Sequence, residues 1–416
     1  MTATASISIQ PNPGPSVRPM RILYLATEMD LGGAEVVART LFNQWAARGH
    51  VPHLLLTYTP GVSAKQIQAD GHSLEALELP HGAKLMLRIS SVRERVRAIN
   101  PDVIIINNQN VLLPWAWTLG SATVPVFAVI HSTETGKLRP SDLVHRLFLP
   151  RYERVITLGE PHARYAMQRF GLSREKLVVI HNGVEPEVRT GTGPEVRTGI
   201  GPEVRGGTGP SVPTPLEKPL PNLPANAFIG VIAARLHPDK NHMGLLEATK
   251  LVLERHSNFH LLVLGQGDQQ AVLEAHAKTL GIADHIHFLG ARGDVGAILE
   301  RSHLGLISSI TTETLSIAVL EYMRAGLPVV STRLGSLEDQ ILDGKTGFLV
   351  APGDDRALAN AIGTMLENPG LRIQFGAAGK ALQRQKFTSA KMGDGYLELF
   401  QESRGKIKEE SKTSSL

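Results

Sequence analysis

The strongest constraint on the fold is a regular alternation of short apolar runs with stretches of helical periodicity, which occurs twice along the chain. The run MRILYLA at 20–26 precedes LGGAEVVARTLFNQWAARGH at 31–50, whose apolar residues recur at helical spacing. The series continues to LVVIHNGV at 177–184 and restarts with FIGVIAA at 228–234. Strands that alternate with helices form right-handed crossovers and a buried parallel sheet. We therefore predict an α/β fold of two tandem, doubly wound domains, with substrate bound in the cleft between their sheets.

A Gly/Pro-rich octapeptide repeat separates the two series. EPEVRTGTGPEVRTGIGPEVRGGTGP offers only one sizeable apolar side chain per repeat, which is too little to offset the entropy of ordering it. We predict an extended, poorly ordered linker over residues 184–224. The other predicted segments are a disordered lead-in at 1–19, an N-terminal domain at 20–183, a C-terminal domain at 225–385, a C-terminal helix at 386–401 and a disordered tail at 402–416.

Charge and composition narrow the classes of function. There are 43 Lys and Arg against 39 Asp and Glu, a formal charge of +4, which is too balanced to indicate a nucleic-acid-binding protein. Residues 1–182 carry 19 basic against 13 acidic side chains, so the N-terminal half could face an anionic acceptor or a membrane, although ordinary surface charge explains this equally well. The chain has no cysteine, no run of roughly 20 apolar residues and no signal-peptide pattern. We expect a cytoplasmic protein, soluble or peripheral to a membrane.

The segment SSITTETLSIAVLEYMRAGLPVVST places two carboxylates, Glu313 and Glu321, in an apolar stretch. Thr311 and Thr312 offer N-cap oxygens and Gly326 a left-handed C-cap, so the pattern predicts a helix with Glu313 in or just before its first turn. At about 1.5 Å rise per residue, the two glutamates would lie roughly 12 Å apart along the helix axis.

Between these carboxylates, the amides near Leu315, Ser316 and Ile317 would point outward at the positive end of the helix dipole, where anions bind. This arrangement fits an elongated ligand with phosphates in its middle and hydroxyls at both ends, such as a nucleotide sugar. Glu313 would accept hydrogen bonds from the sugar, and Glu321 from the ribose. Alternatively, Glu313 only favours the dipole and Glu321 is an exposed helix residue, although the apolar neighbours of Glu321 argue against exposure.

Two cations follow the first strand of the C-terminal half. Arg235 and Lys240, in AARLHPDK, lie five residues apart on the loop that leaves this strand, so both can converge at its carboxyl end. Two fixed cations can neutralise the charge that develops on a departing nucleoside diphosphate. The alternative is a solvated loop pair. The chain contains no Asp-x-Asp sequence and no obvious carboxylate cluster, so we expect neither a metal nor another cofactor.

The two glutamates with seven residues between them, followed by AGLPVV, resemble the retaining glycosyltransferases of the GT-B fold, family 4. LGGAE at 31–35, AARLHPDK at 233–240 and the segments VLGQGDQ, IHFLGARGDV and DGKTGFLVAPGD agree in order and spacing. The resemblance implies two Rossmann-like domains that face each other across a cleft. It also implies metal-independent transfer with retention, and a C-terminal helix that crosses back to the N-terminal domain.

The resemblance also assigns roles to individual residues. His131 corresponds to the histidine that touches the donor sugar near the reacting carbon, although a lone histidine after an apolar run is more often structural. Gly32 and Gly33 would let backbone amides approach the phosphate or the acceptor. The remaining residues expected to line the nucleotide are Gly265, Gly267, Arg292 and Val295. Where family members often have Phe-Gly or Leu-Pro after the first glutamate, this chain has Leu315 and Ser316, which leaves the donor undetermined.

These patterns lead to one main hypothesis about function. The chain is expected to be a hexosyltransferase that moves a sugar from a UDP-, GDP- or ADP-sugar to a saccharide or lipid-linked acceptor in envelope or exopolysaccharide biosynthesis. A sugar-nucleotide epimerase of the same architecture is a second hypothesis. A catalytically silent sugar-nucleotide-binding scaffold, whose repeat recruits a partner, is a third.

Overall fold

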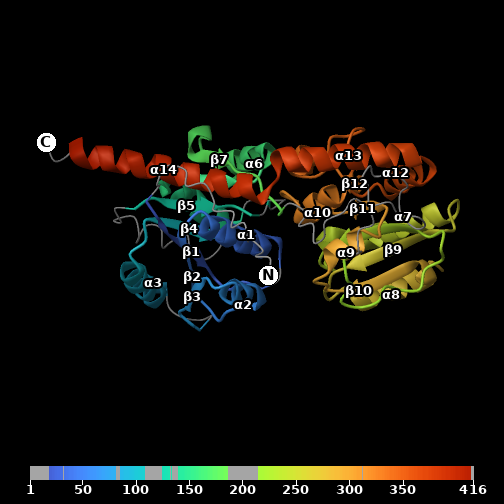
Figure 1. The fold of residues 1–416 in the computed structure, drawn as a ribbon, viewed down its shortest axis with the longest axis horizontal. Coiled ribbons are helices and arrows are strands. Elements are labelled where there is room, and N and C mark those ends of the chain that lie inside the picture. Colours follow the sequence, from blue (N-terminus) through green and yellow to red (C-terminus); the bar gives the residue numbers. More distant parts are fainter. Residues whose placement is uncertain are drawn as a thin grey trace, which may run out of the picture.

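The computed structural model describes two parallel-sheet α/β domains in tandem (Figure 1). The predicted α/β fold is therefore confirmed. The described residues are 18–30, 32–80, 85–107, 124–131, 133, 139–185, 214–311 and 313–413. Several sequence predictions lie outside them, namely those for residues 1–17, Leu31, the stretch near Trp115, the repeat at 186–213 and Thr312.

The N-terminal domain is built on a seven-stranded sheet in the order β3-β2-β1-β4-β5-β6-β7. Its interior strand β1 has five of six residues buried, because helices cover both faces of a parallel sheet. The strands are β1 (Arg21–Ala26), β2 (Val51–Leu56), β3 (Ser73–Ala76), β4 (Val103–Asn107), β5 (Val126–Val129), β6 (Arg154–Thr157) and β7 (Leu177–Val179). The helices are α1 (Gly33–Ala47), α2 (Val62–Ala69), α3 (Leu85–Ile99), α5 (Pro140–Phe148) and α6 (Glu160–Phe170), with short 3₁₀ turns η1 (Leu149–Arg151) and η2 (Arg174–Lys176).

The C-terminal domain has a six-stranded sheet in the order β10-β9-β8-β11-β12-β13. Strands β8 and β11 are neighbours at its centre, so the loops that follow them meet at the same edge. The strands are β8 (Phe228–Ala233), β9 (Phe259–Leu264), β10 (Ile286–Gly290), β11 (Leu304–Ile307), β12 (Val329–Thr332) and β13 (Gly347–Val350). The helices are α7 (His242–Leu253), α8 (Gln270–Thr279), α9 (Val295–Leu299), α10 (Ile317–Ala325), α11 (Leu337–Gln340), α12 (Asp355–Glu367), α13 (Pro369–Lys386) and α14 (Ser389–Thr413), with 3₁₀ turns η3 (Pro238–Lys240) and η4 (Ala283–His285).

The last part of the predicted linker, residues 214–224, packs on the C-terminal domain. Thr214 Oγ1 donates a hydrogen bond to Glu300 at 2.9 Å, and the Glu217 amide donates to Asp294 at 2.7 Å. Three leucines of this segment also pack against the core: Leu216, Leu220 and Leu223. The prediction of a poorly ordered linker is therefore wrong for this part, because its apolar and polar groups find partners that the sequence pattern does not reveal.

Helix α14 leaves the C-terminal domain and runs across the N-terminal domain (Figure 1). Phe400 of α14 lies between Trp45 and Phe127, with ring centroids 6.0 and 5.2 Å away. Arg404 adds an ion pair with Asp102 at 2.8 Å. The helix continues to Thr413, so the predicted disordered tail at 402–416 is wrong up to that residue.

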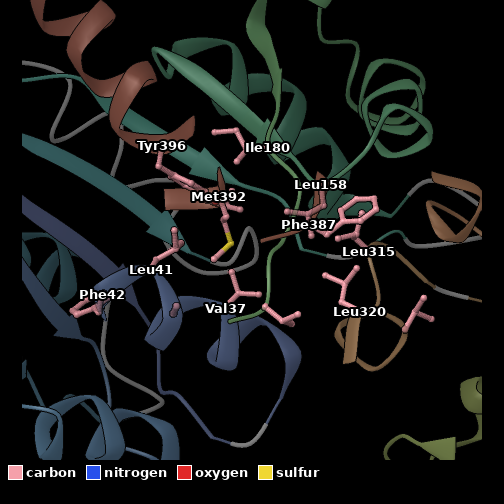
Figure 2. Close-up of a cluster of buried hydrophobic side chains, with 14 of the residues drawn as sticks. Val37, Leu41, Phe42, Leu158, Ile180, Leu315, Leu320, Phe387, Met392 and Tyr396 are labelled. Carbon is pink, nitrogen blue, oxygen red and sulfur yellow. The ribbon is translucent and has the colours of Figure 1, made fainter. Parts of the chain in front are cut away.

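One cluster of buried hydrophobic side chains includes residues of both domains (Figure 2). Leu41 and Leu158 come from the N-terminal domain, and Leu315 and Leu320 from the C-terminal domain. Phe387, at the start of the chain segment that returns to the N-terminal domain, packs in the same cluster. Contact between the domains is thus partly hydrophobic.

The two chain segments that connect the domains pair with each other. Val184 and Thr388 form an isolated parallel β-bridge, in which the Val184 amide donates to the Phe387 carbonyl and the Ser389 amide donates to the Val184 carbonyl, both at 3.1 Å. A Cβ atom at the preceding Gly183 would lie 2.2 Å from the Thr388 carbonyl oxygen, so only glycine permits this approach.

Candidate active site

Lys240, one of the two predicted cations, lies beside Glu313, the first predicted carboxylate, at the carboxyl ends of β8 and β11. Lys240 ends η3, and Glu313 lies in the loop that follows β11. Lys240 Nζ is 2.6 Å from Glu313 Oε1, and Ser309 Oγ donates to the same oxygen at 2.6 Å. The two charged side chains are only 17% and 10% exposed, so solvent screens their attraction less than at an open surface. The fold therefore brings together two predicted site residues that are 73 positions apart.

Arg235 is exposed on the loop between β8 and η3. Burial favours a higher pKa for Asp239, but the hydrogen bond with His237 and the charges of Lys240 and Arg235 bring this pKa below its usual value. Across the domain junction, burial raises the pKa of Glu35 at the start of α1, and the charge of Arg235 opposes this rise. Arg235 thus lies near carboxylates of both domains, and near the loop that holds Lys240.

The helix that carries the second glutamate begins later than predicted. α10 spans Ile317–Ala325 with Ser316 at its N-cap, so Glu313 precedes the helix and Thr311 does not cap it. Glu313 interacts with side chains of the β8 and β11 loops, and the chain reaches Ser316 in an irregular conformation. The predicted helical separation of Glu313 and Glu321 is therefore wrong, and Glu321 lies in the second turn of α10.

The backbone of Ser316 is held by a side chain that the sequence did not single out. The Ser316 amide donates to Gln340 Oε1, and Gln340 Nε2 donates to the Ser316 carbonyl, both at 2.8 Å. The Ser316 amide is therefore not available to an anion, contrary to the prediction. The amides of Ile317, Ala318 and Val319 open the first turn of α10, where a helix supplies no carbonyl partners of its own.

Glu321 is half-buried in the same region. Burial raises the pKa of its carboxyl group, and the charge of Arg324 opposes the rise. Burial also raises the pKa of Tyr322, and the negative charges of Glu321 and Glu313 raise it further, so both carboxylates lie near one phenol. The Tyr322 hydroxyl accepts a hydrogen bond from the Ala233 amide at 2.7 Å, which fixes α10 against the end of β8.

Loops of the N-terminal domain meet the start of α10 directly. A Cβ atom at Gly33 would lie 3.7 Å from Ile317 Cγ1, and Thr314 Oγ1 donates to the His131 carbonyl at 3.0 Å. Among the described residues, His131 Nε2 has no hydrogen-bond partner although it is buried. Burial, together with the nearby His162, lowers the pKa of His131 to about 4. The imidazole is therefore neutral near pH 7 and presents a polar atom without charge.

Leu315 joins the two domains through its side chain and its backbone. Its side chain is buried in the cluster of Figure 2, and its carbonyl accepts a hydrogen bond from Asn182 Nδ2 at 3.3 Å. The side chain is therefore not positioned to contact a donor, and the prediction for Leu315 applies at most to its backbone.

Gly265 and Gly267, after β9, are required by close backbone packing. Gly265 has φ 137°, and a Cβ atom there would lie 2.0 Å from the Ala234 carbonyl oxygen. A Cβ atom at Gly267 would lie 2.3 Å from the Leu236 carbonyl oxygen. The two glycines therefore let the β9 loop lie against the loop of Arg235, whether or not they also contact a nucleotide.

Arg292 has a structural role in this conformation. Its guanidinium is 2.6 Å from Asp294 and donates to the Lys218 carbonyl at 2.7 Å. The Arg292 side chain is 2% exposed, and its hydrogen bond lowers the pKa of Asp294 to about 2. The buried guanidinium is thus occupied by protein groups, and we do not retain Arg292 as a donor-binding residue. Val295, the first residue of α9, is half-buried and packs against the core shared by the domains.

Within the part of the chain that the structure describes, no three His, Asp or Glu side chains are grouped as ligands of a metal ion. The same residues include no helix that is both long enough and apolar enough to cross a membrane.

Comparison with known families identifies this site. Residues 216–382 match the family described as Glycosyl transferases group 1, and residues 31–188 match the one described as Glycosyltransferase Family 4. Together the matches include strands of both sheets and the loops with Gly33, His131, Lys240 and Glu313. The chain belongs to the group 1 and family 4 glycosyltransferases. It is therefore an enzyme, and its two Rossmann-like domains form the GT-B fold.

Two named relatives are similar in sequence to this glycosyltransferase over different lengths of the chain. A phosphatidyl-myo-inositol mannosyltransferase of Mycobacterium leprae is 27% identical over 369 residues, which cover 85% of this chain and 89% of the relative. A putative glycosyltransferase of Bacillus subtilis, EpsD, is 32% identical over 153 residues, or 37% of this chain and 40% of that protein.

Solved structures resemble the glycosyltransferase in fold. HepE of Anabaena in complex with UDP has a TM-score of 0.75 at 20% identity, over 92% of this chain and 100% of that one. HepE in complex with UDP-glucose has a TM-score of 0.72 at 21% identity over the same shares.

The structure adds two residues to the glycosyltransferase site that sequence reasoning missed. Glu35 lies at the start of α1, and its carboxylate occupies the space where a Cβ atom of Gly32 would lie, 2.4 Å from Oε2. A glutamate three residues after the residue that precedes a helix is a helix-capping pattern, so the sequence did contain a signal for Glu35. Gln340 gave no such signal, because nothing in the local pattern relates it to Ser316.

Proposed function

We propose that this glycosyltransferase retains anomeric configuration and transfers a hexose from a nucleoside-diphosphate sugar to a saccharide or lipid-linked acceptor in envelope or exopolysaccharide biosynthesis. The observation that carries the proposal is the Lys240–Glu313 pair beside the start of α10, opposite Gly33 and His131 of the N-terminal domain. HepE, which has the same fold, binds UDP and UDP-glucose, and the M. leprae relative is a mannosyltransferase. We also propose a cytoplasmic location, which suits a chain without cysteine.

The proposed chemistry depends on stabilising a departing diphosphate. Lys240 is held close to the start of α10 by Glu313, and Arg235 extends from the same loop. Their positive charges, with the first amides of α10, would interact more strongly with the diphosphate as its bond to the sugar breaks. Such groups accelerate a reaction because they are already oriented before charge develops.

The hydroxyls of the donor would be held at both ends. Glu313 would accept hydrogen bonds from the transferred sugar once the donor enters, and Glu321 would accept them from the ribose. His131 is neutral near pH 7 because burial lowers its pKa to about 4, so its ring can hydrogen-bond a sugar hydroxyl without introducing a second buried charge. Retention would follow if the leaving phosphate takes the acceptor proton on the same face of the sugar.

Thermal-shift measurements with UDP, GDP, ADP and their glucose and mannose conjugates test the donor assignment. We expect one nucleoside diphosphate to stabilise the wild type, and Glu321→Ala to weaken its binding by about 10- to 100-fold, because a hydrogen bond to a charged group is lost. Glu367→Ala is a matched control, since this glutamate is 46% exposed on α12 and pairs with Arg255. A ligand that binds Glu321→Ala as tightly as wild type would refute the ribose assignment.

Product analysis tests the reaction itself. Incubation of the stabilising nucleotide sugar with lipid-linked and saccharide acceptors should give a glycoside whose anomeric configuration, measured by NMR, equals that of the donor. An inverted product would overturn retention. Steady conversion of the donor to another nucleotide sugar without acceptor would indicate an epimerase, and binding without any turnover would indicate a silent scaffold.

A further inference from the structure

Helix α6 of the N-terminal domain begins without a capping side chain of its own. Gly159 occupies its N-cap, with an extended backbone conformation that any residue adopts, and supplies no side-chain hydrogen bond. Pro161 in the first turn has no amide hydrogen, which leaves the Glu160 amide as the first donor of the helix. Such an amide needs a partner from outside the helix. Neither the glycine nor the partner is therefore explained by α6 alone.

Helix α11 of the C-terminal domain explains both. A Cβ atom at Gly159 would lie 2.5 Å from Asp339 Oδ2 and 2.6 Å from Ser336 Oγ, so a side chain at this position would displace α11. The Glu160 amide donates to Asp339 Oδ2 at 3.2 Å. Asp339 thus takes the place of the missing capping side chain, and it does so from the other domain.

The surroundings of this contact are largely buried. Asp339 is half-buried, and burial raises the pKa of its carboxyl group, while nearby His181 and the hydrogen bond from the Glu160 amide oppose the rise. Ser336 is fully buried, and among the described residues its Oγ has no hydrogen-bond partner. Leu158, just before the N-cap of α6, packs in the cluster that includes residues of both domains (Figure 2). The start of α6 is therefore partly enclosed by the C-terminal domain.

Helix α11 also connects this contact with both halves of the site. Beside Asp339, its last residue Gln340 holds the backbone of Ser316 just before α10. The first turn of α6 contains His162, which accepts a hydrogen bond from the Leu158 amide at 3.3 Å and lies near His131. Adjacent residues of one short helix therefore contact the start of α10 and the helix that lies beside His131.

We propose that Asp339 is a positioning residue of the glycosyltransferase site: by capping α6, it fixes the His131 side of the N-terminal domain against the start of α10. Lys240, Glu321 and the first amides of α10, which we assign to the donor, all lie in the C-terminal domain. Loss of the cap should therefore change the separation of the domains and leave the affinity for a nucleoside diphosphate nearly unchanged. The proposal concerns the same site as the proposed function and rests on it for the nucleotide measurement alone.

A chain without cysteine allows the separation of the domains to be measured between two spin labels by electron paramagnetic resonance. The labels are attached to Val62→Cys on α2 and Val272→Cys on α8, which replace exposed residues of different domains. Relative to this labelled parent, Asp339→Ala should raise the population at altered distances by roughly 2- to 30-fold, the effect expected for the loss of a helix cap. Gly159→Ala should also raise it, because its methyl group would overlap Asp339 and Ser336.

Matched variants separate the cap from general effects of substitution. Asp339→Asn should keep the parent distances, because asparagine can accept the same amide and caps helices about as well as aspartate. Asp354→Ala removes a cap within the C-terminal domain, where Asp354 accepts a hydrogen bond from the Ala357 amide at 2.8 Å, and should not move the domains. Gly370→Ala adds a methyl group where a Cβ atom would meet nothing within 4 Å, and it should also keep the parent distances.

Thermal shifts with UDP, GDP and ADP provide the second measurement, in which the stabilising nucleoside diphosphate should bind Asp339→Ala within about threefold of wild type. The proposal is overturned if Asp339→Ala and Gly159→Ala keep the parent distances, if Asp354→Ala changes them as much, or if Asp339→Asn behaves like Asp339→Ala. A larger loss of nucleotide affinity in Asp339→Ala would also overturn it, because Asp339 would then support α10 rather than position the domains. No thermal shift in wild type would refute only the donor assignment, since the distance measurement needs no nucleotide.

Discussion

Replacing Gln340 by Met should loosen the start of α10 more than it disturbs the rest of the protein. Gln340 is fully buried and exchanges two 2.8 Å hydrogen bonds with the backbone of Ser316. Met has a similar length and would fill the same space, but it neither donates nor accepts these bonds. The variant therefore isolates the polar contribution of the amide.

The expected magnitude follows from those two bonds. Each contributes about 1 kcal/mol net, and an orphaned amide adds about 1–3 kcal/mol. The Ser316 carbonyl also accepts from the Leu320 amide at 3.3 Å, so its loss is smaller than that of the Ser316 amide. We expect local opening of residues 313–320 to become easier by about 2–4 kcal/mol, which is roughly a 30- to 1000-fold change in its equilibrium constant.

Hydrogen-deuterium exchange of the peptide that contains residues 313–320 measures this opening directly, with the affinity for the stabilising nucleoside diphosphate as a second readout. Gln383→Met is the matched control: Gln383 is 1% exposed, and it donates to the Phe387 carbonyl at 3.1 Å rather than to the backbone of Ser316. The reasoning fails if Gln340→Met leaves exchange in this peptide as slow as in wild type, or if Gln383→Met accelerates it equally.

Three further predictions concern charge, backbone conformation and pH. Lys240→Met should lower the transfer rate by about 10²- to 10³-fold and Lys240→Arg by less, because the latter keeps the charge beside Glu313; equal rates for Met and wild type would exclude the proposed role. Asn241 has φ 49°, and its side chain caps α7 by accepting a hydrogen bond from the Gly244 amide. In urea denaturation, Asn241→Ala should lower the free energy of unfolding by about 1–2 kcal/mol and Asn241→Gly by only a few tenths of a kcal/mol. Equal losses for the two variants would contradict this prediction. Burial lowers the pKa of His131 and His303 from 6.5 to about 4, so the unfolded chain binds more protons than the folded protein between these two pH values. The free energy of unfolding should therefore fall as the pH drops from 6.5 to about 4. A free energy of unfolding that stays flat or rises toward about pH 4 in urea titrations would contradict this prediction.

The parts of the fold that the sequence predicted correctly depend on local patterns. Strand β1 is an apolar run because both faces of a parallel sheet are covered, and α1 shows helical spacing because one face packs inward. The resemblance of AARLHPDK and of the spaced glutamates to a known family also predicted which loops meet, because those loops follow the adjacent strands β8 and β11.

The errors arise where a distant residue determines local conformation. Thr311 and Glu313 look like the start of a helix, but Glu313 binds Lys240, 73 positions away, and the helix starts only after Ser316 is held by Gln340. Similarly, the segment after the repeat resembles a linker until Glu217 reaches the backbone of Gly293. No local propensity contains these contacts, because each partner lies on a different element of the fold.

The bridge between Val184 and Thr388 fixes how the enzyme can change shape. Among the residues that the structure describes, the outgoing and returning chains are hydrogen-bonded to each other at this bridge, where Gly183 allows backbone to touch backbone. Two connecting segments that are joined at one point permit rotation of the domains about that point, but they resist sliding or separation of the domains. The glycosyltransferase should therefore open and close by rotation of its two domains about the Val184–Thr388 bridge. Each turnover would then return Lys240 to the same position opposite His131.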